Sequence, residues 1–437
     1  MNKKILHLAI PNILSNISIP LLSSVDTAVM GHLDSPVYLG AIALGSIIFN
    51  FIYWGFGFLR MGTTGLTAQA IGANNNKEVS AILARSLFIS IFIGLVLIVL
   101  QFPISQIGFY LINGSKDVEF FAKEYFYIRI FAAPATLSLY AFHGWFLGVQ
   151  NAKYPLYVTL LVNVLNIILN LIFVFEFGMK ADGVALGTVI SQYIGVLFSL
   201  LLIKKSYKNS LNFQHFNSIF QRDKFEKFFK VNLDIFLRTL LLIFTISFFT
   251  AKSAEMNDII LAANFILMQL WMIIAYGVDG FAFAAESLVG KYIGSRDNVK
   301  LKMTIKFSFL WGISLGIFVS IIYLIFGREI LELYSKQQEV IEAGMNFLMW
   351  IIISPIINSV SFIWDGIYFG ATETRKMLYS MIFSTIFVFL PVYFLTKDLL
   401  GNHSIWMALV TFMIFRGFTL SLIYFKKIKP VIFIKNK

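Results

Sequence analysis

The chain has 437 residues, no cysteine and a formal net charge of +12. Hydrophobic residues make up 58% of the sequence and charged residues only 13%, whereas soluble domains typically carry about 45–50% and about 25%. This composition excludes an ordinary soluble globular protein, a disordered chain and a disulfide-stapled secreted domain. The apolar runs are long and do not alternate with polar residues, which argues against an outer-membrane β-barrel.

Twelve long apolar segments follow one another along the chain, separated by short polar breaks. Within a bilayer only helices and closed barrels satisfy every backbone polar group, so the sequence predicts an all-α protein with twelve transmembrane helices. Several segments exceed 25 residues, and we therefore expect tilted or bent helices. The approximate ranges are 7–31, 39–70, 85–112, 121–148, 154–178, 183–203, 230–251, 258–290, 303–327, 340–370, 377–397 and 401–425.

The two halves of the chain resemble each other at an offset of 222 residues. Residues 55–72 align with 277–294, and Gly148 and Gly370 share the same offset. Because six helices separate the two copies, the repeat is parallel, with its axis along the membrane normal. We therefore expect an N-terminal six-helix lobe at 1–203, a cytoplasmic linker at 204–229 and a C-terminal six-helix lobe at 230–437.

Lysine and arginine are distributed unevenly between the two sides of the membrane. Counted by alternation from the N-terminus, 24 fall on the first side, 7 on the other and 4 within the spans. Cytoplasmic loops carry the excess of positive charge, so we expect both termini in the cytoplasm of a multi-pass protein in the bacterial cytoplasmic (inner) membrane. Since the membrane topology accounts for the positive net charge, we expect no nucleic-acid partner. We expect a monomer whose partners are the lipid bilayer and a small-molecule substrate.

The first predicted helix carries Asp26, the deepest acidic residue of the N-terminal half. At 100° per residue, Asp26 belongs to a polar stripe on an otherwise apolar helix; the other members are Asn12, Ser15 and Ser23. Pro11 and Pro20 on the same helix can each remove a backbone hydrogen bond, and they are candidate hinges. Charged groups inside a membrane are costly and usually face a cavity or another charge, so Asp26 is a candidate ion-coupling residue.

The fifth predicted helix carries three asparagines on one face, namely Asn163, Asn166 and Asn170. Amides buried in a membrane require partners, and the carboxylate of Asp26 is the natural candidate. Burial disfavours the charged form of a carboxylic acid, so Asp26 could exchange a proton or bind Na⁺. The alternative is that the three asparagines only bond helices to one another.

The C-terminal half contains more charged residues within its predicted spans. Asp234 and Arg238 are spaced for an i, i+4 pair on the seventh helix, and Asp279 and Glu286 share one face of the eighth. Asp365 and Arg416 lie in the tenth and twelfth helices. These six residues predict a largely neutralised charge network, which is either structural or part of the transport mechanism.

The sequence contains no nucleotide-binding loop, because Gly290-Lys291 lacks the upstream glycine and is followed by Tyr292. Two six-helix halves without a nucleotide site suggest a secondary transporter that needs no cofactor and is driven by H⁺ or Na⁺. A metal site is not expected, apart from possible Na⁺ binding at Asp26. One alternative is a flippase for a lipid-linked sugar, whose cationic cavity would be lined by Arg60, Arg129 or Arg238.

Arg60 and Arg129 are otherwise expected near helix ends, with their charged groups reaching the membrane surface. A membrane-embedded enzyme is the third possibility. It would need a nucleophile–base pair or metal ligands within the spans, and the sequence offers no convincing set. We therefore expect a transporter rather than an enzyme.

The segment VDTAVMGHL (25–33) resembles the first-helix signature of the DinF branch of multidrug and toxic compound extrusion (MATE) transporters. Five further blocks resemble the family in the same order: GWFLGVQNAKYP (144–155), NVLNIILN (163–170), YGVDGFAFAAES (276–287), WDGIYFGAT (364–372) and LGNHSIWMAL (400–409). The resemblance implies two six-helix lobes around a central cleft. It also implies alternating access, with antiport of small, amphipathic, often cationic compounds against H⁺ or Na⁺.

The family's first-helix carboxylate falls on Asp26, and its fifth-helix polar cluster falls on Asn163, Asn166 and Asn170. The sequence departs from the family at one of these positions, since related members often have an aspartate in place of Asn170. One titratable group is thus absent, and Asp26 would have to act alone in the N-terminal lobe unless the ion site lies elsewhere.

Overall fold

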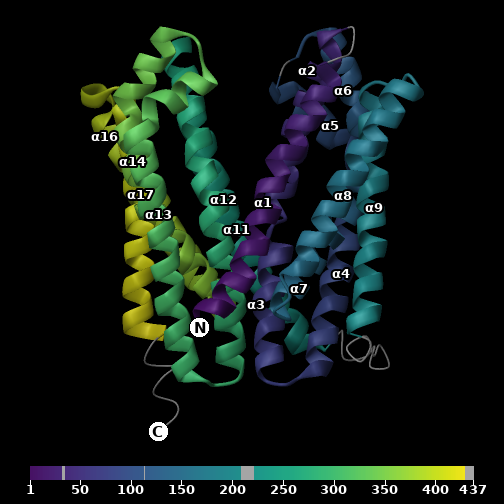
Figure 1. Ribbon diagram of the computed structural model, residues 1–437, viewed down its shortest axis with the longest axis vertical. Coiled ribbons are helices and arrows are strands. Elements are labelled where there is room, and N and C mark those ends of the chain that lie inside the picture. Colours follow the sequence, from purple (N-terminus) through teal and green to yellow (C-terminus); the bar gives the residue numbers. More distant parts are fainter. Residues whose placement is uncertain (32–34, 113, 208–220, 429–437) are drawn as a thin grey trace. The chain divides into compact units, whose positions relative to one another are not determined.

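The computed structural model describes residues 1–31, 35–112, 114–207 and 221–428, with only the backbone described for 19–31 and 427–428 (Figure 1). The elements of the N-terminal half are α1 (Asn2–Gly31), α2 (Pro36–Gly55), α3 (Phe58–Gly72), α4 (Asn76–Val99), α5 (Gln101–Ile112), α6 (Lys116–Arg129), the 3-10 turn η1 (Ile130–Ala132), α7 (Ala133–Gly148), α8 (Lys153–Leu171), the π-helix η2 (Ile172–Glu176) and α9 (Ala181–Ser206). The elements of the C-terminal half are α11 (Arg222–Ala254), α12 (Asp258–Gly294), α13 (Asn298–Tyr334), α14 (Gln338–Ala371), α15 (Thr374–Phe383), the π-helix η5 (Ser384–Phe389), α16 (Leu390–Leu400), α17 (Asn402–Ile423) and the π-helix η6 (Tyr424–Ile428).

The twelve predicted spans all coincide with helical stretches. Eleven stretches among the described residues are long and apolar enough to cross a membrane. Helix α1 supplies the twelfth, because its 30 residues extend for about 45 Å at about 1.5 Å per residue. The prediction of an all-α membrane protein with twelve transmembrane helices is therefore confirmed.

Several of the long spans are bent or interrupted, as their lengths predicted. The span from Pro36 to Gly72 breaks between α2 and α3, and α13 contains a kink at Phe326, whose φ and ψ are −111° and 18°. Helix α14 continues through Pro355, and α1 likewise continues through Pro11 and Pro20. The role of these last two prolines as hinges stays a prediction.

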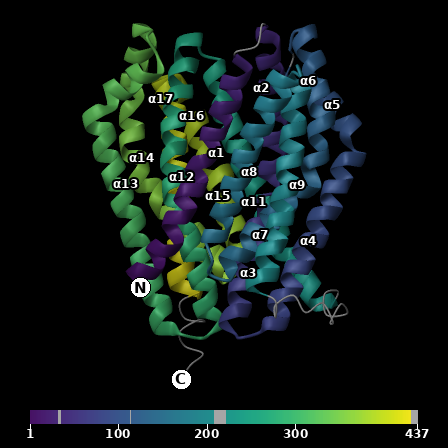
Figure 2. The same cartoon turned by 45° about the vertical axis from the view of Figure 1, so that its right-hand side comes forward.

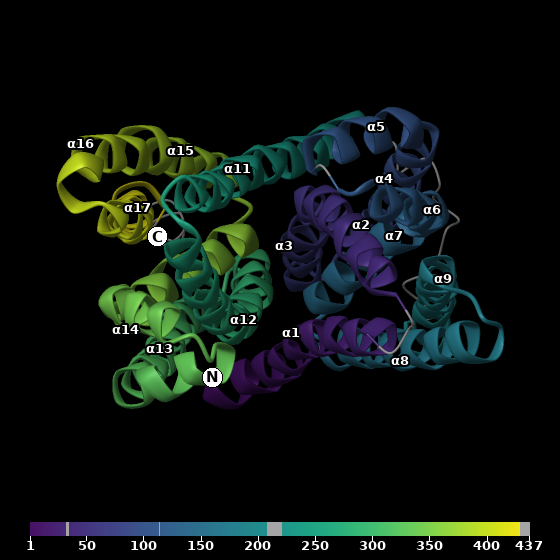
Figure 3. The same cartoon turned by 90° about the horizontal axis from the view of Figure 1, so that it is seen from above.

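The described residues form two compact units, of which unit 1 contains Met1–Ile13 and Lys230–Lys437, and unit 2 contains Leu14–Phe229. In unit 2, α3 and α4 pack on α7, α2 packs on α6, and α8 lies beside α9 (Figure 2). In unit 1, α12 and α13 pack on α14, and α16 lies beside α17 (Figure 3). The boundary between the units falls inside two helices, α1 and α11.

The first residues of α1 complete the core of unit 1. Ile5 and Ala9 are fully buried there, and a Cβ atom on Gly280 would lie 2.9 Å from the carbonyl oxygen of Ala9. The start of α11 plays the corresponding part in unit 2. Phe228 belongs to the buried cluster around Trp145, so each unit is completed by a segment from the other half of the chain.

The sequence repeat reappears in the way that helices approach each other. A Cβ atom on Gly144 of α7 would lie 2.3 Å from the carbonyl oxygen of Arg60 on α3. At the offset of 222, a Cβ atom on Gly366 of α14 would lie 2.1 Å from the carbonyl oxygen of Ala282 on α12. Such distances are shorter than any tolerated contact, so only glycine permits these two backbone approaches.

The repeat also extends to the turns between helices. Asn74 and Arg296 occupy equivalent positions and both have left-handed backbone angles, with φ of 55° and 56°. The following residue caps the next helix in each half: the side chain of Asn75 accepts from the N–H of Glu78 at 3.1 Å, and Asp297 accepts from Lys300 at 3.0 Å. Both halves thus use the same turn chemistry.

The glycine contacts give a first testable prediction. Gly144→Ala and Gly366→Ala should each destabilise the protein, because the added methyl group would force two helix backbones apart at a cost of about 1–3 kcal/mol. Thermal denaturation of the detergent-purified protein measures the effect. Gly57→Ala is the matched control, since its nearest neighbouring atom would be 3.4 Å away, and an unchanged midpoint for both test variants would contradict the packing argument.

Candidate functional site

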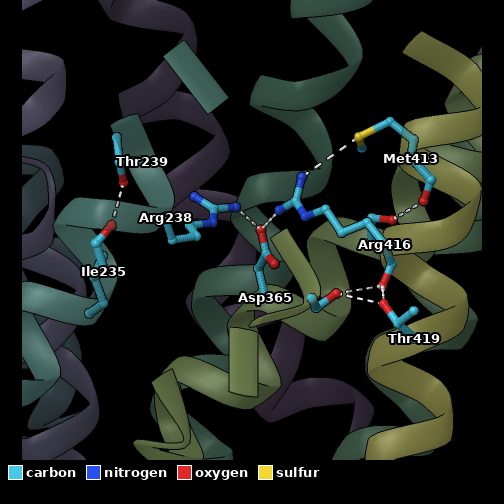
Figure 4. Close-up of polar contacts among 9 residues, drawn as sticks. Ile235, Arg238, Thr239, Asp365, Met413, Arg416 and Thr419 are labelled. Atoms are coloured by element: carbon cyan, nitrogen blue, oxygen red, sulfur yellow. Dashed lines mark hydrogen bonds and ion pairs between the residues drawn. The ribbon is translucent and has the colours of Figure 1, made fainter. Parts of the chain in front are cut away.

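The polar centre of unit 1 is a carboxylate held between two guanidinium groups. Oδ2 of Asp365 on α14 accepts hydrogen bonds from Arg238 on α11 and from Arg416 on α17 (Figure 4). All three side chains are buried, with exposed fractions of 7%, 5% and 1%. Burial of ionised groups is tolerated only with such pairing, so this triad ties three helices together inside the unit.

The sequence predicted a network of six charged residues, and the structure brings three of them into direct contact. Arg238, Asp365 and Arg416 form the triad, and Asp279 is close enough to act electrostatically on Arg416. Asp234 instead accepts a hydrogen bond from Thr374 at 3.1 Å. The remaining member, Glu286, is fully buried on α12.

The triad retains unused hydrogen-bonding capacity. Among the residues that the structure describes, Oδ1 of Asp365 and Nε of Arg238 have no hydrogen-bond partner. The guanidinium of Arg238 also lies over the ring of Phe369, 5.8 Å from its centroid. Its ion pair with Asp365 and its contact with Phe369 hold Arg238 inside unit 1. The positive charge of Arg238 is therefore balanced by a carboxylate of the same unit.

The three asparagines of α8 connect this helix to two neighbours in unit 2. Nδ2 of Asn163 donates to the side-chain oxygen of Ser18 on α1 at 3.2 Å. Nδ2 of Asn166 donates to Thr188 on α9 at 3.1 Å, and Nδ2 of Asn170 donates to Oδ1 of Asn166 at 3.2 Å. Sequence reasoning missed the part played by α9, because the periodicity of one helix does not identify its neighbour.

Asp26 lies on α1, but its side chain is outside the described part of the structure. The backbone of α1 nevertheless follows α8 in a consistent register. Ser15 donates to Thr159 at 3.1 Å, and the next contact, one turn further along, joins Ser18 to Asn163. Whether Asp26 meets the asparagines therefore stays a prediction.

Unit 2 contains a second polar centre around Arg129, for which the sequence offered either a position near a helix end or a place in a cationic cavity. Nη1 of Arg129 donates to the hydroxyl of Tyr125 and lies 3.5 Å from Oγ of Ser46. The guanidinium lies over the rings of Phe49 and Tyr125, 5.0 and 5.4 Å from their centroids. Arg129 is the last residue of α6, as expected of a residue near a helix end, and η1 and α7 continue the helical stretch to Gly148. Whether its charged group reaches the membrane surface stays a prediction.

The triad leads to a prediction about stability. Asp365→Asn should strongly destabilise the protein, by about 3–5 kcal/mol, because two buried guanidinium groups would lose their shared counter-charge. The temperature at which the purified protein loses its monodisperse gel-filtration peak measures the effect. Glu339→Gln, which removes an exposed carboxylate from the first turn of the same helix, should leave it unchanged. Equal stability of the two variants would contradict the assignment.

Comparison with known proteins identifies the family. The family model MatE matches residues 11–172 and again 235–395, one match in each half. The DNA damage-inducible protein F of Escherichia coli is 36% identical over 424 residues, covering 97% of this chain and 92% of the relative. A probable multidrug resistance protein NorM of Photorhabdus laumondii is 24% identical over 424 residues, covering 93% of this chain and 92% of the relative.

Solved structures agree with the fold. The crystal structure of MATE in the bent conformation superposes with a TM-score of 0.90 at 19% identity, covering 98% of this chain and 96% of that chain. Proteins of this family are transporters and not enzymes. With two matched halves and a relative similar over nearly its whole length, the chain belongs to the MatE family as a DinF-like transmembrane transporter.

Proposed function

We propose that the protein is a secondary active antiporter that exports small amphipathic compounds in exchange for H⁺ or Na⁺ by alternating access. Membership of a transporter family gives the general role. The absence of a nucleotide-binding loop from the sequence makes an ion gradient the energy source. Cationic compounds are the substrate class that the family resemblance implies.

The observation that carries the coupling proposal is the buried amide row beside α1. Asn166 and Asn170 have exposed fractions of 2% and 0%, and Asn163 bonds to α1 at Ser18. Residue 26 follows Ser18 by two helical turns, as Asn170 follows Asn163 by two turns on α8. If the two helices keep this register, position 26 lies level with the end of the amide row.

This arrangement supplies a physical basis for exchange. Amide N–H groups stabilise an ionised carboxylate, and protonation of Asp26 removes the charge that they stabilise. Pro11 and Pro20 then allow α1 to bend as its contacts change. One charge moving through about 100 mV supplies about 2.3 kcal/mol, which corresponds to roughly a 50-fold gradient of substrate.

The orientation and the lobe boundaries belong to the same proposal. The positive-inside rule places both termini in the cytoplasm of the inner membrane. The linker at 204–229 then joins the lobes 1–203 and 230–437 on the cytoplasmic side. A monomer suffices, because each chain carries both halves of the repeat.

The test is Asp26→Asn in proteoliposomes loaded with ethidium and subjected in turn to an imposed pH gradient and an imposed sodium gradient. The variant should lose gradient-driven transport while inserting normally, because an amide cannot exchange a proton or balance a cation. Wild-type transport under only one of the two gradients identifies the ion.

Asp117→Asn is the matched control, since Asp117 is exposed in the first turn of α6. Its transport rate should equal that of the wild type. Full gradient-driven transport by Asp26→Asn would remove Asp26 from the coupling mechanism.

A further inference from the structure

Three lysines from three helices of unit 1 meet around one tyrosine, at the end of the unit where α1 begins. Lys4 on α1 donates to the hydroxyl of Tyr292 on α12 at 3.4 Å. Nζ of Lys300 on α13 lies over the ring of Tyr292, 6.0 Å from its centroid. Lys291 precedes Tyr292 on α12, and both Lys4 and Lys300 act on it electrostatically. Segments far apart in the sequence thus gather positive charge at one place.

The first turn of α1 is held in this position by contacts with α13 (Figure 2). Oγ1 of Thr304 donates to Sδ of Met1 at 3.5 Å, and Nε1 of Trp311 donates to Oδ1 of Asn2 at 3.3 Å. These contacts place Lys4 beside two other lysines although like charges repel each other. The lysines are therefore brought together by the fold and not by a carboxylate that all three share.

The cluster contains more positive than negative charge. Nζ of Lys300 pairs with Oδ2 of Asp297 at 2.5 Å. Lys4 and Lys291 form no ion pair with any carboxylate among the residues that the structure describes. Lys4 and Lys300 are exposed and Lys291 is half-buried, so an anion from outside the protein can reach all three.

The equivalent corner of unit 2 is balanced by its own residues. At the offset of 222, none of the three lysines is matched by a cation, and the counterparts of residues 4, 291 and 300 are Glu226, Gln69 and Glu78. Glu78 binds Arg85 and Lys224, each at 2.7 Å. Both corners lie on the same side of the membrane in a parallel repeat. The positive-inside rule applies to both, so it does not explain the excess charge at one of them.

The surface next to the lysines changes from charged to apolar along α13. Lys300, Trp311 and Phe318 share one face of this helix, at spacings of 11 and 7 residues. Trp311 is partly buried, and tryptophan is typical of the boundary between headgroups and acyl chains. Phe318 is 60% exposed. A ligand that fits both parts of this surface has an anionic head and apolar chains, which favours a phospholipid over free phosphate.

We propose that Lys4, Lys291 and Lys300 bind the headgroup phosphate of an anionic phospholipid, whose acyl chains lie along α13 past Trp311. Clusters of basic residues at the end of membrane spans bind such headgroups. The hydroxyl of Tyr292 accepts from Lys4, so its own proton is available to a phosphate oxygen. Because the lysines come from three helices, the bound lipid holds the start of α1 on α12 and α13. The site goes beyond the transport function and does not depend on the exported compound.

Native mass spectrometry of the full-length protein in detergent tests the proposal. The protein is titrated with phosphatidylglycerol or phosphatidylcholine that carry the same acyl chains, and the affinity for the first bound lipid is measured. The wild type should bind phosphatidylglycerol more tightly by about tenfold or more, because two lysines without a carboxylate partner each add to the attraction of an anionic headgroup. The preference should decrease as the ionic strength rises.

Substitutions assign the preference to the cluster. Lys4→Gln and Lys291→Gln should each weaken the binding of phosphatidylglycerol by about fivefold and leave that of phosphatidylcholine unchanged. Lys291→Gln introduces the residue that unit 2 has at its equivalent position 69. Lys77→Gln is the matched control, since Lys77 is an exposed lysine in the first turn of α4 at the equivalent corner of unit 2.

Thermal denaturation separates lipid binding from a purely structural role of the lysines. Without lipid, Lys4→Gln and Lys291→Gln should melt no lower than the wild type, because each removes a repulsion between like charges. Phosphatidylglycerol should raise the melting temperature of the wild type, and the double variant Lys4→Gln/Lys291→Gln should lose this increase.

Equal affinity of the wild type for the two lipids would overturn the proposal, and so would an unchanged preference for phosphatidylglycerol in the double variant. Lower melting temperatures of the single variants without lipid, together with wild-type lipid affinities, would assign the lysines a structural role instead. Stabilisation by inorganic phosphate without any preference for phosphatidylglycerol would assign the cluster to a free anion and remove the lipid site.

Discussion

One carboxylate oxygen, Oδ2 of Asp365, fixes the relation of α11, α14 and α17 within unit 1. Two buried guanidinium groups share this one counter-charge, so these helices can separate only at a large electrostatic cost. A close backbone contact reinforces this arrangement, because Gly366 lets α14 approach the backbone of α12 directly. Two adjacent residues of α14 therefore stabilise unit 1, Asp365 through its ion pairs and Gly366 through the close approach of two helix backbones.

Unit 2 builds the same backbone arrangement with different chemistry. At the offset of 222, the counterpart of Asp365 is His143 and that of Arg238 is Asn16. The glycine approach and the left-handed turns are retained, whereas the polar groups joining α8 to its neighbours are amides and hydroxyls. Neutral hydrogen bonds are individually weaker than ion pairs, so α8 can exchange its partners at lower cost than the helices joined by Asp365.

Sequence reasoning recovered what depends on local pattern. Hydropathy and turn residues predicted the spans, and the offset of 222 paired Gly148 with Gly370. A Cβ atom on these glycines would lie 3.0 Å from the carbonyl oxygen of Thr64 and 2.3 Å from that of Glu286, which are equivalent positions. The sequence pattern could not identify which side chains on different helices contact each other. Asp234 and Arg238 are correctly spaced for a pair along α11, yet Arg238 reaches across to Asp365 because α14 presents a buried carboxylate there. The position of Arg129 at the end of α6 agrees with the expectation, whereas its contact with the ring of Phe49 on α2 could not be predicted, because the pattern of one helix does not identify its neighbour.

The division of α1 and α11 between the units has a consequence for biogenesis. The core of unit 2 lacks Phe228 until the ribosome has passed the middle of the chain, and the core of unit 1 requires residues made at the very beginning. Neither compact unit is thus made from one half of the chain alone. Each core can reach its final packing only after the segment from the other half has been synthesised and inserted.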